Sequence, residues 1–305
     1  MPYQENFENK VRVIGKEYLE SGEIPVISSW GRSIPETWEN AVIATWEYGT
    51  NIPTEYDQDI DPESRDATVM MVVTNPMQEP RIHKALPTGY RDLEVYRQEV
   101  VDGIHDHYVR DGGWSYSYHD RIKNWPGEDS WKTILGTGVA NFDLPHVDQI
   151  DAIVNRLSAT PHSRRAQAVT WFPPIDSKHH EPPCLQRIWC RVIKSENDLY
   201  LLEMNTDWRS RDAFKAAFMN IYALTDLQRK MAEDISKMTG RNVSPGRYVD
   251  KSDSFHIYGS YLRNDDFKRF LLSLEKRTFE QRVIRSDDPI VKGEIESATG
   301  ELGIG

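Results

Sequence analysis

The residue best suited to covalent chemistry is Cys184, which follows Glu181-Pro182-Pro183 at the start of a predicted strand. The two prolines fix the backbone before the thiol and remove two N–H donors, so the thiol is expected at a rigid junction between a loop and a strand. Nearby arginines would raise its thiolate fraction, which is what a nucleophile needs. A buried cysteine at a strand end fits the same pattern, and Cys190, in mid-strand, is expected to lie in the core.

Four polar residues beside predicted strands suit a phosphate monoester. Arg164 and Arg165 belong to a predicted turn, and Arg209 with Ser210 directly follows a predicted strand. Guanidinium groups and a serine hydroxyl are the donors that a phosphate group requires. Each arginine taken alone is more typical of a solvated surface, so the residues indicate an anion site only as a set.

Three further side chains could recognise the rest of a nucleotide. His256 and Tyr258 are two residues apart in a predicted strand and therefore face the same side. They could hydrogen-bond a ribose or be half-buried sheet residues. Asn220 lies near the apolar face of a predicted helix, where a buried carboxamide must find partners. It could offer a donor and an acceptor to a pyrimidine edge, or tie two loops together.

The nine histidines do not form a recognisable metal site. His105 and His107 are two residues apart on a predicted helix and would point in different directions. His179 and His180 lie in a predicted loop that lacks a paired carboxylate pattern. No HExxH, CxxC or glycine-rich phosphate loop occurs, so we expect no metal.

Composition restricts the possible partners. The 305 residues include 37 Lys plus Arg against 48 Asp plus Glu, a formal charge of −11. This charge argues against nucleic-acid binding as the function, and a small anion would need a local cluster of arginines. The absence of a long apolar run or a signal-like N-terminus, together with two cysteines, favours a cytoplasmic protein without a membrane span.

Strand and helix patterns do not alternate regularly, which predicts an α+β fold with a mixed or antiparallel sheet. Helices are expected at 7–22, from Ser33 to Trp46, and at 92–109, 148–157, 213–238 and 265–276. Strands are expected at 68–74, 165–172, 184–193, 199–208, 247–249 and 254–258. The last thirty residues show no clear pattern.

In this order the motifs resemble those of the thymidylate synthase superfamily, over about half the chain and most strongly from 148 to 258. The matching segments are Asp148-Gln149-Ile150, Ser163-Arg164-Arg165, Trp171, Pro183-Cys184, Arg209-Ser210-x-Asp212, Asn220 and Ser254-Phe255-His256-Ile257-Tyr258. In addition, Ser64-Arg65-Asp66-Ala67-Thr68 resembles the family's loop with a phosphate-binding arginine, and Glu99 matches its essential glutamate. The resemblance implies one domain over 1–305, with 1–90 and 278–305 poorly matched. It also implies a large twisted mixed sheet packed with helices, and a homodimer that meets at the sheet and shares its active sites.

The resemblance further implies roles for the residues. Cys184 would attack C6 of a pyrimidine nucleoside monophosphate, Glu99 would organise proton transfer, and 5,10-methylenetetrahydrofolate would supply a one-carbon unit to C5. The binding residues implied are Arg65, Arg209 and Ser210 for the 5′-phosphate with Arg164 and Arg165 from the other subunit, Asn220 for the base, His256 and Tyr258 for the 3′-hydroxyl, and Asp212 for the folate.

Three departures from the family pattern leave the reaction open. Leu185 stands where histidine is frequent, the usual glycine after the RSxD motif is missing from 213–217, and no apolar closing peptide is recognisable at 299–305. We expect reductive methylation of dUMP, since Asn220 favours uracil. The alternatives are 5-hydroxymethylation of dUMP, dCMP or CMP, and a non-catalytic nucleotide-binding module.

Overall fold

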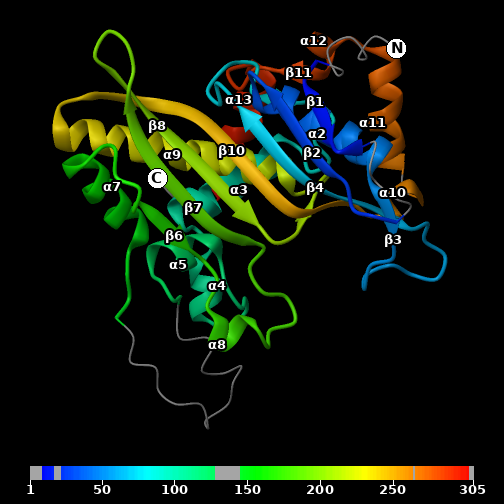
Figure 1. Ribbon diagram of the computed structural model, residues 1–305, viewed down its shortest axis with the longest axis horizontal. Helices are drawn as coiled ribbons and strands as arrows, with labels where there is room; N and C mark the ends of the chain where they lie inside the picture. The colour runs from blue at the N-terminus through cyan, green and yellow to red at the C-terminus, as the bar shows by residue number, and fades with distance from the viewer. Residues whose placement is uncertain (1–8, 17–21, 128–144, 264, 302–305) are drawn as a thin grey trace. The chain divides into compact units, whose positions relative to one another are not determined.

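The computed structural model describes residues 9–16, 22–127, 145–263 and 265–301 (Figure 1). The chain divides into two compact units. The first comprises Met1–Val95, Trp208–Tyr222 and Arg247–Gly305, and the second comprises Tyr96–Asp207 and Ala223–Gly246. Among the described residues, no helix is long and apolar enough to cross a membrane.

The first unit is built on a mixed sheet. Its strands run in the order β1-β2-β4-β10, where β3 also pairs with β4 and β9 with β10. Their bounds are Val11–Ile14 for β1, Val26–Gly31 for β2, Thr50–Ile52 for β3, Ser64–Val73 for β4, Arg211–Asp212 for β9 and Asn242–Ile257 for β10. The β2–β4 and β9–β10 pairs are parallel and the others antiparallel. The α+β prediction with a mixed sheet is thus confirmed.

Helix α2 (Ile34–Tyr48) packs on β2 and β4 of this sheet. It begins after Ser33 with Pro35 in its first turn, as the sequence predicted, because the fixed φ of proline suits a helix start. Trp38 is fully buried, and its indole N–H donates to the Ala213 carbonyl at 2.9 Å. The helix therefore anchors both the sheet and the segment that follows β9.

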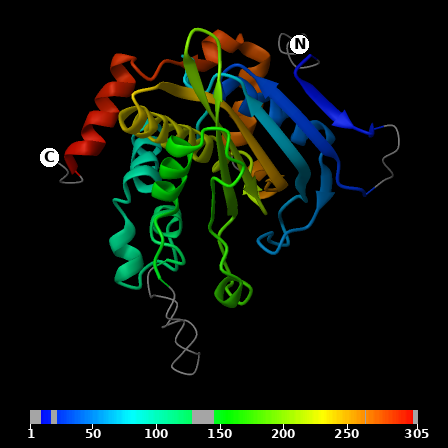
Figure 2. The same ribbon diagram turned by 60° about the vertical axis from the view of Figure 1, so that its left-hand side comes forward.

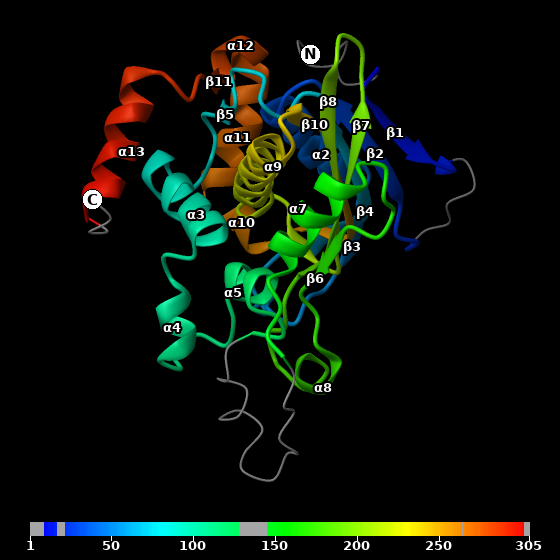
Figure 3. The same ribbon diagram turned by 90° about the vertical axis from the view of Figure 1, so that its left-hand side faces the viewer.

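The remaining elements of the first unit are β5 and the helices and strand formed by residues 260–301. They are β5 (Ile82–His83), α10 (Ser260–Arg263), α11 (Asp265–Lys276), α12 (Phe279–Arg282), β11 (Val283–Ile284) and α13 (Pro289–Glu301). Figure 3 shows α11 and α12 beside the antiparallel pair of β5 and β11. Phe267, Phe270 and Leu274 are buried at the spacing of one helix face, which explains why α11 has the predicted bounds.

The second unit contains a long hairpin (Figure 2). Strands β7 (Leu185–Lys194) and β8 (Leu199–Trp208) are neighbours, and β6 (Gln167–Val169) pairs antiparallel with β7. Asn197 and Asp198 adopt positive φ in the turn, where both residue types are tolerated. The helices that lie wholly within the described residues of this unit are α4 (Asp106–Arg110), α5 (Tyr118–Lys123), α7 (Gln149–Ala159) and α8 (Pro173–Asp176).

Four elements contribute residues to both units: α3 (Tyr90–Asp102), β8 through its last residue Trp208, α9 (Ala217–Thr239) and β10. Helix α9 ends before Gly240, whose φ of +69° is favourable for glycine. It begins four residues later than predicted, after the turn that follows β9.

Several predicted elements were wrong in extent or type. Within the helix expected at 7–22, the described residues 9–16 contain the strand β1 instead, which pairs with β2; residues 7–8 and 17–21 lie outside the described residues. The helix expected at 92–109 ends at Asp102 because Gly103 adopts a φ of +69° and interrupts it. The strand at 165–172 is reduced to β6, and the described residues from 279 to 301, for which no pattern was recognised, form α12, β11 and α13.

The two strands expected at 247–249 and 254–258 belong to the single strand β10. A register shift between Ser252 and Phe255 explains why the alternation broke there. Residues 302–305 of the C-terminal segment that did not match a closing peptide lie outside the described residues.

Candidate active site

In the second unit, Cys184 lies directly before β7 and is half-buried. Its turn is held on both sides: the Gln186 side chain donates to the Pro183 carbonyl at 2.8 Å, and the Thr170 hydroxyl donates to the Leu185 carbonyl. The thiol is therefore located at a firmly held junction of loop and strand, as its sequence context predicted. A nucleophile in such a position needs little reorganisation before attack.

Tyr118 is one of two functional candidates that sequence reasoning missed. Its hydroxyl accepts a hydrogen bond from the Leu185 N–H at 3.4 Å, beside the thiol-bearing residue. Burial raises the pKa of Tyr118, and Tyr116, Cys184 and Tyr96 raise it further, so the phenol stays protonated. A neutral hydroxyl next to a nucleophile can donate to a reacting group or orient a water. The repeated tyrosines were the only signal in the sequence.

Glu99 lies on α3 and is half-buried. Burial raises its pKa, an effect that Asp106 reinforces and that the hydrogen bond to His105, 3.1 Å away, partly opposes. A carboxyl group with a raised pKa is suited to proton transfer near neutral pH. The structure therefore gives Glu99 a fitting environment, while its role stays a prediction.

Arg164 and Arg165 lie in the exposed turn between α7 and β6. The backbone is fixed there, because the Trp189 indole donates to the Arg164 carbonyl at 3.1 Å and Ser163 accepts from the Arg165 N–H at 3.3 Å. Neither guanidinium has a hydrogen-bond or ion-pair partner in the part of the chain that the structure describes. Two outward-facing arginines on a held turn can serve a ligand or a second subunit.

In the first unit, the sheet brings predicted site residues together on neighbouring strands. His256 of β10 lies opposite Asp66 of β4 and beside Asp212 of β9. Arg65 of β4 lies opposite Ile257, and its guanidinium donates to the Gly49 carbonyl at 3.1 Å. The predicted residues for phosphate, ribose and folate thus converge at one end of this sheet.

His256 offers an acceptor atom. Its ring lies 4.5 Å from that of Tyr258, which confirms that the two residues share a face. Burial lowers the pKa of His256, although Asp212 and Asp66 oppose this, so the ring is neutral near pH 7.

The Ser254 hydroxyl donates to Asp66 at 2.7 Å and lies 3.3 Å from His256 Nδ1, which must then carry the ring proton. The other ring nitrogen, Nε2, is buried and has no hydrogen-bond partner among the residues described. It is therefore an acceptor that could bind a hydroxyl group of a ligand.

Asp212 is already engaged by its own turn. One carboxylate oxygen accepts from the N–H groups of Phe214 and Lys215 at 3.0 and 2.9 Å, and the other accepts from the Tyr261 hydroxyl. A carboxylate has about four acceptor positions, so it can accept one further donor from a ligand. The turn fixes the direction from which that donor must come.

Asn220 is buried on α9, as predicted, and Arg211 orients it. The Arg211 Nε–H donates to the carboxamide at 3.2 Å, and since arginine has no acceptor, the atom facing it must be Oδ1. Arg211 is held by a buried ion pair with Asp250 and by stacking on Trp208 at 4.0 Å. Arg211, the unspecified position of the RSxD motif, was not predicted as a site residue.

Arg209 and Ser210 follow β8 at half-exposed positions, directly before β9. His105 and His107 have rings 6.3 Å apart at the start of α4. Within the described ranges, no group of three or more histidine, cysteine, aspartate or glutamate residues could hold a metal ion.

Known proteins resemble this chain in both sequence and fold. The family model for thymidylate synthase matches residues 88–290, a range that contains every predicted site residue except Arg65. A protein named "Putative thymidylate synthase" from Methanosarcina mazei is 30% identical over 190 residues, which cover 62% of this chain and 71% of that protein. Another of the same name from Methanothermobacter marburgensis is 35% identical over 181 residues, covering 58% and 65%.

A solved structure, the thermostable thymidylate synthase A from Bacillus subtilis, has a similar fold. Its TM-score is 0.50 at 18% identity, and the match covers 76% of this chain and 82% of that one. The fold, the family model and the curated relatives lead to one conclusion: the chain is a divergent member of the thymidylate synthase superfamily.

Proposed function

We propose that the protein transfers a one-carbon unit from 5,10-methylenetetrahydrofolate to C5 of a pyrimidine nucleoside monophosphate, and that the reaction is the reductive methylation of dUMP. Family membership supports the reaction class. The observation that carries the proposal is Cys184, half-exposed on a firmly held turn with the neutral Tyr118 phenol beside it. Attack of this thiol on C6 would give C5 the carbanion character that it needs to accept carbon.

The nucleotide would be bound by the residues that the sequence singled out. Arg65, Arg209 and Ser210 would contact the 5′-phosphate, because guanidinium groups bind phosphate through paired hydrogen bonds. His256 Nε2, buried without a partner in the described part of the chain, would accept a hydrogen bond from the 3′-hydroxyl, with Tyr258 beside it. A His256→Ala variant is expected to bind the nucleotide about tenfold more weakly, by calorimetry.

The base would be uracil. Because Asn220 Oδ1 faces Arg211, the carboxamide NH2 group lies on its other edge. An NH2 donor suits the O4 acceptor of uracil, whereas cytosine presents an amino donor at that position. Calorimetry with dUMP and dCMP tests this choice: tight binding of the cytidylate and none of the uridylate would contradict it.

The folate would supply the carbon and, for methylation, a hydride. Asp212 fits the role predicted for it, since its carboxylate retains acceptor capacity within a fixed turn. Water must be excluded for hydride delivery to succeed, and hydroxymethylation would follow if water were admitted. The RSxD motif at Arg209–Asp212 and Asn220 follow the pattern of the methylating members of the family, which favours methylation.

One assay separates the reactions. The protein is incubated with dUMP and 5,10-methylenetetrahydrofolate while dihydrofolate absorbance and the mass of the nucleotide are followed. Dihydrofolate together with a methylated base supports the proposal. Tetrahydrofolate with a gain of one CH2O unit identifies the hydroxymethylase instead, and an unchanged nucleotide with dUMP, dCMP and CMP contradicts one-carbon transfer altogether.

The proposal includes a homodimer in which Arg164 and Arg165 contact the phosphate bound by the partner. Their exposure and their lack of partners within the described chain support this. Mixing Arg164→Ala with Cys184→Ala subunits is expected to restore activity, because one site of each heterodimer would be intact. No recovery in confirmed heterodimers would exclude shared sites.

A further inference from the structure

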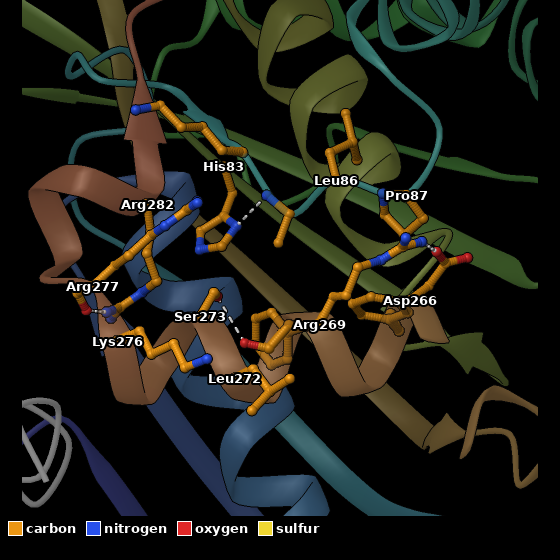
Figure 4. A pocket seen from close by; sticks show the side chains of 14 residues that line it. His83, Leu86, Pro87, Asp266, Arg269, Leu272, Ser273, Lys276, Arg277 and Arg282 are labelled. Carbon is orange, nitrogen blue, oxygen red and sulfur yellow. Dashed lines mark hydrogen bonds and ion pairs between the residues drawn. The ribbon is translucent and has the colours of Figure 1, made fainter. Parts of the chain in front are cut away.

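A basic pocket of about 450 Å³ lies within the first unit, between the loop after β5 and helix α11 (Figure 4). Its polar lining is almost entirely cationic. The charged or titratable lining residues are His83, Lys84, Asp266, Arg269, Lys276, Arg277 and Arg282. None of the residues predicted for the active site lines it.

The inner wall of the pocket is rigid. Arg282 forms two hydrogen bonds of 2.6 Å with Glu39, and His83 Nε2 lies 2.9 Å from the same carboxylate. The Ala85 N–H donates to His83 Nδ1 at 3.1 Å, so this nitrogen is an acceptor and the ring N–H at Nε2 points at Glu39. Although burial raises the pKa of Glu39, the hydrogen bonds from His83 and Arg282 leave it below the ordinary value.

The rim carries charge that is not neutralised. Arg282 is paired with Glu39 and Arg269 with Asp266. Lys84 donates only to the Gln281 carbonyl, at 3.0 Å. Neither Lys276 nor Arg277 has a carboxylate partner in the described ranges, and both side chains are exposed. Three positive charges therefore gather at one opening, in a chain whose net charge is −11.

This arrangement differs from ordinary placement of basic residues at a helix C-terminus. Lys276 would complement the dipole of α11 by itself. Lys84 comes from a different element, and Figure 4 shows Lys276 and Arg277 on one side of the pocket with Arg269 and Asp266 on the other. Concave basic surfaces of this kind concentrate anions by focusing the field.

We propose that this pocket binds a small molecule that carries a diphosphate group. Three unpaired cations match a group with two or three negative charges, and Arg277 can engage a phosphate through two parallel hydrogen bonds. Leu86, Pro87 and Leu272 provide an apolar wall for the organic part of the ligand. The volume lies within the range of small-molecule sites. The site is independent of the proposed function, since none of its residues has a role in that reaction.

Calorimetry with inorganic pyrophosphate in magnesium-free buffer tests the proposal. The double variant Lys276→Glu/Arg277→Glu is expected to weaken binding at least about tenfold, because two charge-assisted contacts are lost. The matched control is Lys268→Glu, an exposed lysine on the same helix that does not line the pocket. It is expected to change the affinity less than about twofold. Thermal unfolding of each variant verifies that it folds.

An Arg209→Ala variant separates this pocket from the predicted nucleotide site. Pyrophosphate affinity is expected to survive in Arg209→Ala, whether or not the protein methylates dUMP. Equal binding by the parent and the double variant, equal weakening by Lys268→Glu, or loss only in Arg209→Ala would overturn the proposal. Titrations with ADP and isopentenyl diphosphate then show whether the diphosphate belongs to a nucleotide or to an apolar compound.

Discussion

The two cysteines of this protein show how position along one strand decides the chemistry of a side chain. Cys184 directly precedes β7, whereas Cys190 lies within it, six residues later. An even spacing places both on the same face of an extended chain. Cys184 is half-buried beside Tyr118, while Cys190 is completely buried and its backbone N–H donates to the Ala166 carbonyl at 2.9 Å.

The difference arises from what surrounds each residue along the strand. Burial raises the pKa of the Cys190 thiol to about 12, which keeps it neutral and unreactive. Cys184, in contrast, lies just before the first residue of β7, and Pro182 and Pro183 before it cannot donate backbone hydrogen bonds to a sheet. Its surroundings are therefore side chains of loops and short helices. A cysteine at a strand end can therefore remain accessible and reactive, whereas burial in the middle of the same strand keeps a thiol protonated and unreactive.

The largest expected effect is the difference in kcat between variants that lack one or the other cysteine thiol. Cys184→Ser is expected to lower kcat on the order of 10⁴-fold or more, because a serine hydroxyl without a base is a poor nucleophile. Cys190→Ala is the matched control and is expected to retain kcat within about threefold. Steady-state kinetics with dUMP and the folate measures both; full activity of Cys184→Ser would remove the covalent mechanism.

Alkylation tests the same contrast without relying on turnover. Native protein at pH 8 is expected to take up one carbamidomethyl group from iodoacetamide, at Cys184. With a pKa of about 12, only about one Cys190 thiol in 10⁴ is ionised at that pH, and burial also blocks the reagent. Peptide mass spectrometry locates the label, and a second group is expected only after denaturation. Equal labelling of both cysteines in the folded protein would show that the contrast is false.

Sequence reasoning succeeded where local pattern and burial coincide. The bounds of β8 and α11 were predicted as they occur, since each has an unbroken apolar period. The burial of Asn220 and the shared face of His256 and Tyr258 also followed from spacing alone. These are properties that a single helix or strand imposes on its residues.

What could not be predicted depends on contacts between distant segments. Arg211 was overlooked because an arginine is expected at the surface, and its partner Asp250 lies 39 residues away. Tyr118 reaches Leu185 from 67 residues away. Helix α3 ends at Asp102 because Gly103 adopts a positive φ. The apolar residues on both sides of Gly103 keep a helical spacing, so the sequence predicted one continuous helix.

Tyr118 is the feature that most clearly separates the surroundings of Cys184 from those of Cys190. Tyr118→Phe removes the hydroxyl that accepts from Leu185 and is expected to lower kcat about tenfold, the worth of one hydrogen bond. Tyr200→Phe on β8 applies the same change elsewhere in the second unit and is expected to leave kcat unaltered. Unchanged kinetics of Tyr118→Phe would reduce the phenol to a packing residue.

The smallest expected effect concerns the buried thiol and the dependence of stability on pH. The unfolded Cys190 thiol loses its proton near the ordinary value of 9.0, whereas the folded one keeps it up to about 12. Its contribution to stability is therefore complete below pH 9 and is lost as the pH rises toward 12. Urea unfolding of the parent is expected to show a free energy that falls more steeply above pH 9 than in Cys190→Ala, by up to about 1.4 kcal/mol per pH unit. Below pH 9 the variant is expected to be about 1 kcal/mol less stable, from the small cavity it leaves.

Lysines and tyrosines titrate in both proteins, so only the difference between the two curves of unfolding free energy against pH reports Cys190. Parallel curves would mean that this thiol is not buried.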